Sequence, residues 1–327
     1  MKSNCIDMHC DTLMKAYFQN ADDIFRTDGQ ISIEKLHSAG AMAQFFAIYM
    51  PDPHFVKSMG LSGSFTDEGY IKKNYEIFCN TLKKYPEFAA KAETADEIRA
   101  NSAKGLVSAV LTIEDGKAVN GSFENLKKFY DMGVRAMALT WNFENCFGFP
   151  NSFDPDLMSL GLKPFGKEAI QYMQELGMLI DVSHLSDGGF YDVADICRKP
   201  FIASHSNCRA LSPHSRNLKD DQLKLLGNAG GVTGLNVCPN FLNPDIEDLN
   251  SSLSAMAKHV RHVADVAGIG AVAMGSDFDG TNGDFEMEDC TQLGKLADAL
   301  KKEGFTESEL DGFFYKNVLR VMDEAVK

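Results

Sequence analysis

The stretch Cys5-Ile6-Asp7-Met8-His9-Cys10-Asp11 runs from apolar side chains into polar side chains that can bind metals or protons. Seven later runs are likewise rich in small, apolar or β-branched residues, at 41–49, 106–114, 134–140, 178–184, 201–205, 231–237 and 271–277. Amphipathic helical patterns lie between the runs, for example at 123–130, 165–176 and 254–267. Apolar strands that alternate with helices predict a parallel sheet buried on both faces.

Eight strand-then-helix units in a chain of 327 residues predict a closed (β/α)8 TIM barrel of the α/β class, with an open doubly wound sheet as the competitor. The chain has no G-x-G-x-x-G after its first run and no G-x-x-x-x-G-K-[ST], so it lacks the usual phosphate-binding loops. Polar side chains end at least five of the runs, and in a barrel those ends converge on one mouth. We therefore favour the barrel. No linker or repeat divides the chain, so residues 1–327 are expected to form a single domain.

Charge and cysteine usage bear on the partners and the compartment. Asp and Glu number 46 against 32 Lys and Arg, a net charge of −14, which argues against nucleic acid as a partner. The chain has no stretch of about 18 uninterrupted apolar residues, the length that a membrane-spanning helix needs. No secretion signal is recognised at the N-terminus. The eight cysteines are scattered without a C-x-x-C pair, as is typical of a reducing compartment. A cytoplasmic protein with no membrane partner is expected.

Metal-ligating side chains lie at the predicted strand ends. His9 and Asp11 share one face of the first strand because alternate residues of a strand point the same way. One such residue is explained well enough as a polar group that closes a strand and bonds to a loop. Three of the eight histidines together with three carboxylates favour a metal centre instead: His9, Asp11, Glu114, His184, His205 and Asp277.

Imidazole and carboxylate ligands together suit zinc or a similar divalent ion. Five of these residues, if all are ligands, exceed the four that one tetrahedral site uses. Two ions that share a bridging carboxylate are the simpler interpretation, and two-metal hydrolytic sites have this composition.

The other five histidines carry weaker signals. His259 and His262 lie in a helical pattern and are expected to pack on or face away from a helix. His37 and His54 have no partners in the sequence. His214 follows the sixth run, near the expected mouth, and no role is assigned to it.

Several stretches, in this order along the chain, resemble the membrane dipeptidase (renal dipeptidase) family of zinc peptidases, and its bacterial members in particular. The resemblance runs from about residue 5 to residue 322. The matching stretches are Asp7-Met8-His9-Cys10-Asp11, Thr112-Ile113-Glu114-Asp115-Gly116, Gly161-Leu162-Lys163-Pro164-Phe165-Gly166, Gly177-Met178-Leu179-Ile180-Asp181-Val182-Ser183-His184, Ala203-Ser204-His205-Ser206-Asn207, Ser215-Arg216-Asn217-Leu218 and Gly275-Ser276-Asp277-Phe278-Asp279-Gly280.

The resemblance implies a binuclear zinc dipeptidase on an amidohydrolase-like barrel, with two Zn²⁺ per chain. By position, His9 and Asp11 bind one zinc, His184 and His205 bind the other, and Glu114 bridges both. A water activated by the two ions attacks the scissile carbonyl of a dipeptide. Dipeptides with a C-terminal D-residue are among the candidate substrates, and a homodimer is one expected assembly.

Three further residues receive roles from the resemblance. Asp277 handles the proton, although the sequence alone leaves Asp279 open as an alternative because the two are expected to share a face. Arg216 holds the free carboxylate of the substrate. Trp141 is a departure, since the animal enzymes have a substrate-contacting histidine there; we expect it to line the pocket as an apolar wall.

Two rival functions remain at this point. The same barrel and metals could hydrolyse a cyclic amide, a lactone or a phosphoester, although Arg216 and the stretch 275–280 favour the dipeptidase. A metal-binding protein without catalysis is the other rival, and the complete ligand set argues against it.

Overall fold

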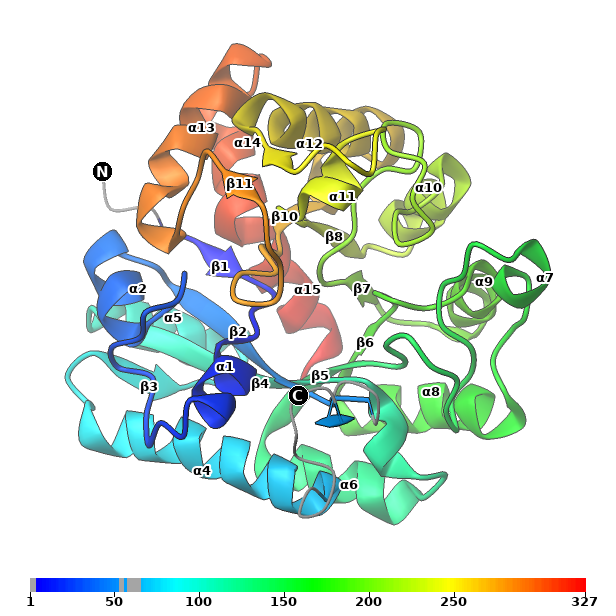
Figure 1. Ribbon diagram of the computed structural model, residues 1–327, viewed down its shortest axis with the longest axis horizontal. Coiled ribbons are helices and arrows are strands. Elements are labelled where there is room, and N and C mark those ends of the chain that lie inside the picture. The colour runs from blue at the N-terminus through cyan, green and yellow to red at the C-terminus, as the bar shows by residue number, and fades with distance from the viewer. Residues whose placement is uncertain (1–3, 53–55, 58–65) are drawn as a thin grey trace.

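The computed structural model describes residues 4–52, 56–57 and 66–327. Eight parallel strands form a closed ring with helices around it (Figure 1), because the pairing of β2 with β4 joins the two ends of the sheet. The predicted (β/α)8 barrel is confirmed, and the open sheet is excluded. In ring order the strands are β1 (Ile6–Asp7), β2 (Ala43–Tyr49), β4 (Val107–Glu114), β5 (Val134–Ala138), β6 (Leu179–Asp181), β7 (Ile202–Ala203), β8 (Val232–Leu235) and β10 (Val272–Met274).

Each predicted run contains one barrel strand, but most strands end earlier than the apolar pattern does. The sequence did not predict β3 (Ala89–Lys91), which pairs with Val107–Ala109 at the beginning of β4. The segment of β4 from Leu111 onward pairs with β5 instead. Two further short strands, β9 (Asn250–Ser251) and β11 (Asp284–Phe285), pair only with each other.

Several of the helices begin at side chains that satisfy free N–H groups of the first turn. The hydroxyls of Ser122, Ser186 and Ser252 accept such hydrogen bonds at three of these helices. None of the described helices has both the length and the apolar character needed to cross a membrane. The helices are α1 (Thr12–Phe18), α2 (Ile33–Ala39), α4 (Asp67–Lys84), α5 (Ala95–Ala103), α6 (Phe123–Met132), α7 (Pro155–Met158), α8 (Pro164–Leu176), α9 (Asp187–Ile196), α10 (Asp220–Asn228), α11 (Pro239–Leu242), α12 (Leu253–Ala267), α13 (Leu293–Lys302), α14 (Glu307–Asp311) and α15 (Asn317–Ala325).

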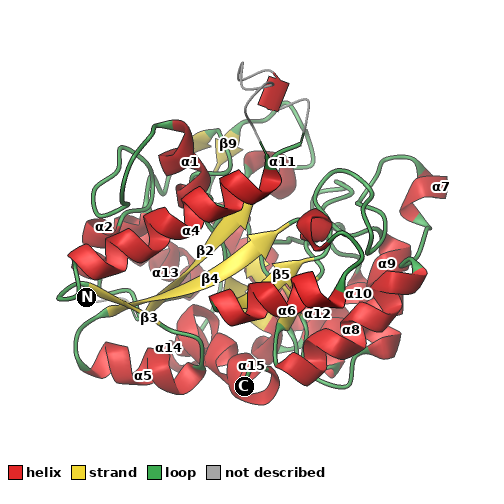
Figure 2. Cartoon of the chain, turned by 90° about the horizontal axis from the view of Figure 1, so that it is seen from below, coloured by secondary structure: helices red, strands yellow, loops and turns green. Residues whose placement is uncertain are grey.

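Apolar side chains fill the lower part of the barrel and leave its upper end to polar groups. Every barrel strand contributes to one buried cluster that also includes residues of α15, with β2 and β4 supplying Phe45 and Val110. Helix α15 lies across one end of the ring, below the strands in Figure 2. That end is therefore closed by packing, and the carboxyl ends of the strands form the other, open end.

Close backbone contact between β7, β8 and β10 generates a stability prediction. A Cβ added to Gly275 would lie 1.7 Å from the carbonyl oxygen of Ser204 and 3.0 Å from Gly234 Cα, and these backbone atoms cannot rotate away. We expect Gly275→Ala to lower the free energy of unfolding by about 1–3 kcal/mol, the usual cost of overpacking. Gly270→Ala is the control, because its added Cβ meets open space. Urea unfolding of both metal-free variants measures this, and equal midpoints would contradict the prediction.

Candidate active site

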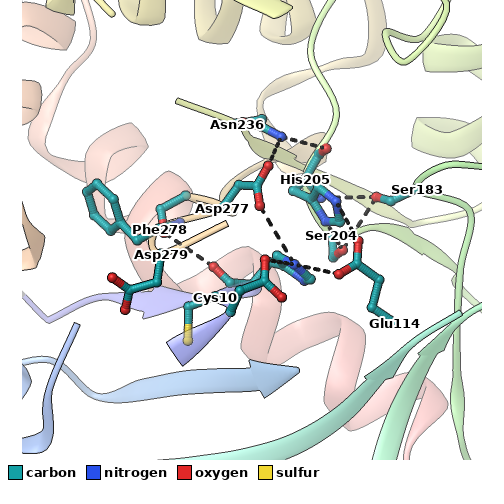
Figure 3. A network of polar contacts seen from close by, with 12 residues as sticks. Cys10, Glu114, Ser183, Ser204, His205, Asn236, Asp277, Phe278 and Asp279 are labelled. Atoms are coloured by element: carbon teal, nitrogen blue, oxygen red, sulfur yellow. Dashed lines mark hydrogen bonds and ion pairs between the residues drawn. The ribbon is translucent and has the colours of Figure 1, made fainter. Parts of the chain in front are cut away.

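Five barrel strands deliver the predicted site residues to one buried cluster at the open end. Glu114 is the last residue of β4, and the other five residues lie within the first few positions after their strands. Except for half-buried Asp277, all are buried. The residues brought together are His9, Asp11, Glu114, His184, His205 and Asp277 (Figure 3 draws part of this network).

The two oxygens of Glu114 face different imidazoles. Oε2 lies 3.4 Å from His9 Nε2. Oε1 lies 2.8 Å from His184 Nε2 and 3.5 Å from His205 Nε2. A carboxylate between imidazoles on two sides is an arrangement that can bridge two metal ions.

The second group of ligands surrounds His9. Its Nε2 lies 3.5 Å from Asp11 Oδ2 and 3.9 Å from Asp277 Oδ1. His9 Nε2 and Asp11 Oδ1 are buried without a hydrogen-bond partner among the described residues. Unpartnered buried polar atoms are costly, so these two atoms fit the role of metal ligands.

Two ligand sets in the described part of the chain are compact enough to hold a cation. Atoms of His9, Glu114 and His205 lie within 4.8 Å of one another, and so do atoms of His9, Asp11 and Asp277. Nitrogen and carboxylate oxygen are the donors that zinc takes in catalytic sites. The residues therefore fit divalent metal binding.

The charges of the cluster also favour a cation. Burial raises the pKa of Asp277 to about 8 and that of Asp11 to about 6, with repulsion from Glu114 adding to both shifts. Burial also acts on Glu114, but the charge of His9 and the hydrogen bond from His184 outweigh it and lower the pKa of Glu114. A bound divalent ion would favour the charged form of all three carboxylates.

The structure separates the two candidate proton carriers. Asp277 belongs to the cluster, and its Oδ2 accepts a hydrogen bond of 2.9 Å from Asn236 Nδ2. Asp279 points away (Figure 3), where its carboxylate accepts bonds of 2.7 Å from the hydroxyl of Thr12 and the backbone N–H of Gln30. The expectation that the two aspartates share a face is wrong, because both have left-handed backbone conformations, with φ of 63° and 66°.

A cavity of about 640 Å³ opens above the cluster and includes the two predicted substrate-binding residues. Arg216 is 6% exposed, donates to the Ser206 hydroxyl at 3.2 Å and to the His205 carbonyl at 3.3 Å, and lies against the ring of Phe241. The Trp141 ring lies 5.0 Å from that of Tyr49, which lines the same cavity. The cavity thus combines the buried positive charge of Arg216 with aromatic walls.

His214 also lines this cavity, although the sequence assigned it no role. Its Nδ1 accepts the backbone N–H of Arg216 at 3.1 Å, and its ring packs against Phe153 and Phe241. Burial and the charge of Arg216 lower the pKa of His214 to about 4. A neutral His214 therefore supports the loop that carries Arg216.

The remaining histidines lie away from the cluster or outside the described residues. His259 is buried on α12 and bonds to backbone groups, and His262 on the same helix lies 2.7 Å from the Asp220 carboxylate. His37 packs edge-on against an aromatic ring of another segment. His54 is not among the described residues.

Sequence reasoning missed two asparagines that touch the cluster. Asn236, which fixes Asp277, is the second-last residue of the predicted run 231–237 and directly follows β8, so its polar side chain near a strand end was a usable signal. Asn142, beside Trp141, places its Oδ1 3.4 Å from His184 Nδ1. Nothing in the sequence distinguishes Asn142 from an ordinary loop residue.

Comparison with known proteins identifies the family. The model of the membrane dipeptidase family, peptidase family M19, matches residues 1–327. The chain belongs to this family.

Individual relatives extend the comparison. The dipeptidase aclJ of Aspergillus oryzae is 27% identical over 315 residues, which cover 95% of this chain and 73% of that protein. An uncharacterized protein of Klebsiella pneumoniae from the pqqA 5' region is 36% identical over 224 residues, 66% of this chain and 82% of that protein.

Solved structures of the membrane dipeptidase family have the same fold. The structure of a dipeptidase described as an M19 metallo peptidase superposes with a TM-score of 0.88 at 25% identity, covering 100% of this chain and 99% of that one. A metallo peptidase from Rhodobacter sphaeroides, solved with a phosphinate mimic of the dipeptide L-Ala-D-Ala, gives a TM-score of 0.87 at 25% identity, covering 99% and 100%.

Proposed function

We propose that this protein is a binuclear zinc dipeptidase that cleaves the peptide bond of free dipeptides. The main support is that one cavity contains both a buried cluster with imidazoles on two sides of Glu114 and a buried arginine. The ligand set fits metal-assisted hydrolysis. The arginine fits a substrate whose free carboxylate lies close to the bond that is cleaved.

In this proposal His9 and Asp11 hold one ion, His184 and His205 hold the other, and Glu114 contacts both. The opposite orientation of the Glu114 oxygens supports this division. When bound, two divalent ions lower the pKa of a shared water and polarise the scissile carbonyl.

Asp277 then carries the proton. Asn236 fixes its Oδ2, while its Oδ1 faces His9 and the ligand cluster. One carboxylate oxygen is thus held in place, and the other is directed at the reacting groups. Asp277 would take a proton from the attacking water and return it to the leaving amine, which is general acid–base catalysis.

Arg216 binds the carboxylate end of the substrate. Its Nε has no hydrogen-bond partner among the described residues, although the guanidinium is buried. A guanidinium can hold a carboxylate with two parallel hydrogen bonds. A fixed cation in the same cavity as side chains of the ligand cluster favours dipeptides over longer peptides, whose terminal carboxylate would lie farther from the scissile bond.

Trp141 and Tyr49 form an apolar wall of the cavity beside His184. The indole has one N–H donor and no acceptor, so this wall suits a small or apolar substrate side chain. The solved relative that holds an L-Ala-D-Ala mimic supports small side chains and a C-terminal D-residue as candidates.

Compartment and assembly remain parts of the proposal. All eight cysteines are free thiols, which suits a reducing compartment such as the cytoplasm. The net charge of −14 supports a small-molecule substrate rather than nucleic acid. A homodimer and a single domain over residues 1–327 remain predictions.

A substrate panel tests the proposal directly. Zinc-loaded protein is expected to hydrolyse L-Ala-L-Ala or L-Ala-D-Ala and to leave hydantoins, lactones and phosphotriesters intact, as measured by release of free amino acid or hydrolysed product. Turnover of one of the other classes with no dipeptide cleavage would favour the rival hydrolase. Two bound metals without any hydrolysis would favour the non-catalytic protein.

Two carboxylate variants test the assigned roles. Glu114→Gln is expected to lose metal and activity together, because both ions lose a shared ligand. Asp277→Asn is expected to keep both metals and lose about 10²–10⁴-fold in kcat, the usual contribution of a general acid–base group. Elemental analysis and initial rates measure the two effects.

Asp279→Asn is the matched control for these variants, since Asp279 bonds to Thr12 and Gln30 outside the cluster. It is expected to retain metal and most turnover once folding is verified by circular dichroism. Metal loss in Asp277→Asn combined with a pure rate loss in Asp279→Asn would reverse the two roles.

Truncation of Arg216 tests how the substrate is held. We expect Arg216→Ala to lower kcat/KM by the equivalent of about 2–4 kcal/mol, the scale for losing one partner of a buried charge pair. C-terminally amidated dipeptides should be poor substrates of the unaltered enzyme for the same reason. In the variant, free and amidated dipeptides should be cleaved about equally. Equal cleavage by the unaltered enzyme would show that Arg216 does not bind the carboxylate.

A further inference from the structure

A buried aspartate outside the proposed ligand set ties two neighbouring strand ends together. Asp181 is the last residue of β6, and its Oδ1 accepts the backbone N–H groups of Ser183 and Ser204, both at 2.9 Å. Its Oδ2 accepts the Ser204 hydroxyl at 2.5 Å. His184 and His205 come directly after these two serines, so the aspartate fixes the backbone that presents both imidazoles.

Asp7 repeats this arrangement between another pair of neighbouring strands. It is the last residue of β1, and its Oδ1 accepts the backbone N–H groups of Ser276 at 2.8 Å and His9 at 3.2 Å. Its Oδ2 accepts the Ser276 hydroxyl at 2.6 Å. Ser276 directly precedes Asp277. We call the pairs Asp181–Ser204 and Asp7–Ser276 the aspartate–serine clamps.

The backbone beside each clamp is strained. His184 follows Ser183 and Asp277 follows Ser276, and both have left-handed φ angles of 69° and 63°. Non-glycine residues keep such conformations only where the surrounding structure holds them. The backbone N–H groups of Ser183 and Ser276 donate to Asp181 and Asp7. These hydrogen bonds hold the residue directly before each strained position.

The Asp181–Ser204 clamp also selects the tautomer of His205. Ser204 Oγ lies 2.7 Å from His205 Nδ1 and gives its own proton to Asp181. The hydroxyl oxygen therefore accepts the Nδ1 proton, which leaves the lone pair on Nε2. That Nε2 faces Glu114 Oε1 at 3.5 Å. A metal-binding imidazole needs its lone pair on the nitrogen that binds the ion, and its other nitrogen donates a hydrogen bond.

We propose that the two aspartate–serine clamps are positioning elements, each of which preorganises the ligands of one cation. The Asp181–Ser204 clamp serves the cation held by His184 and His205, and the Asp7–Ser276 clamp serves the cation held by His9 and Asp11. This inference rests on the proposed function, because it assumes that two cations bind here.

The test measures zinc affinity as well as activity. Ser204→Ala is expected to weaken one of two zinc equivalents by about 10–100-fold, the usual effect of losing a hydrogen-bond partner of a ligand, and to leave the other unchanged. Ser276→Ala is expected to do the same to one equivalent, and the double variant should weaken both. Ser204→Thr keeps the hydroxyl and should restore most of the affinity. Competition with a chelator at buffered zinc concentrations gives the affinities.

Ser108→Ala is the matched control. Ser108 is a buried serine on β4 that bonds to Asn101, and it lies at the end of that strand away from the cluster. Loss of zinc affinity in this control equal to that of Ser204→Ala would overturn the proposal, and so would unchanged affinity in both clamp variants. If the double variant weakens only one equivalent, the assignment of one clamp to each cation is wrong.

The outcomes also distinguish this inference from the proposed function. Unaltered protein that binds no zinc or cleaves no dipeptide contradicts the proposed function. Unaltered protein that does both, while the clamp variants behave like Ser108→Ala, contradicts the clamps alone. Asp181→Asn, at saturating zinc and verified by circular dichroism, is the second variant if Ser204→Ala does not fold.

Discussion

Glu114 lies buried between imidazoles on two sides, and among the described residues no lysine or arginine forms an ion pair with it. A buried carboxylate is unfavourable unless its charge is balanced nearby. His9 supplies part of that balance, but Asp11 and Asp277 add negative charge to the same small volume. The cluster is therefore most stable with cations in it. The folded barrel brings these groups together because packing around α15 fixes the strands at the other end.

Much of this arrangement could be predicted from the sequence, because two physical signals were strong. Buried parallel strands appear as apolar runs, and polar residues at their ends mark the mouth of a barrel. These signals located all eight barrel strands and the six polar residues that the structure brings together at the open end. The strand β3 was not predicted, because an apolar pattern of only three residues cannot be distinguished from chance.

The missed features depend on tertiary contacts. Asp277 and Asp279 differ in direction because of their backbone angles, which the Asp-x-Asp pattern does not reveal. Asn236 and His214 act through partners 41 and 2 residues away. Asn236 could have been noted as a polar residue near a strand end, but its pairing with Asp277, 41 residues away, could not be read from the sequence. The aspartates at the ends of β1 and β6 likewise appear in the sequence only as polar residues near apolar runs.

The strained residues of this chain are concentrated where the ligands are. Six of the described non-glycine residues have left-handed φ angles, and four of them, Asp115, His184, Asp277 and Asp279, follow barrel strands at the open end. Glycine would relieve the backbone strain at each position, but it would remove the carboxylate or imidazole. At His184 and Asp277, the proposed function therefore requires a side chain at a backbone conformation that favours glycine. The free energy that holds these residues in place has to come from hydrogen bonds such as those of Asp7 and Asp181, and from the closed packing of the barrel below them.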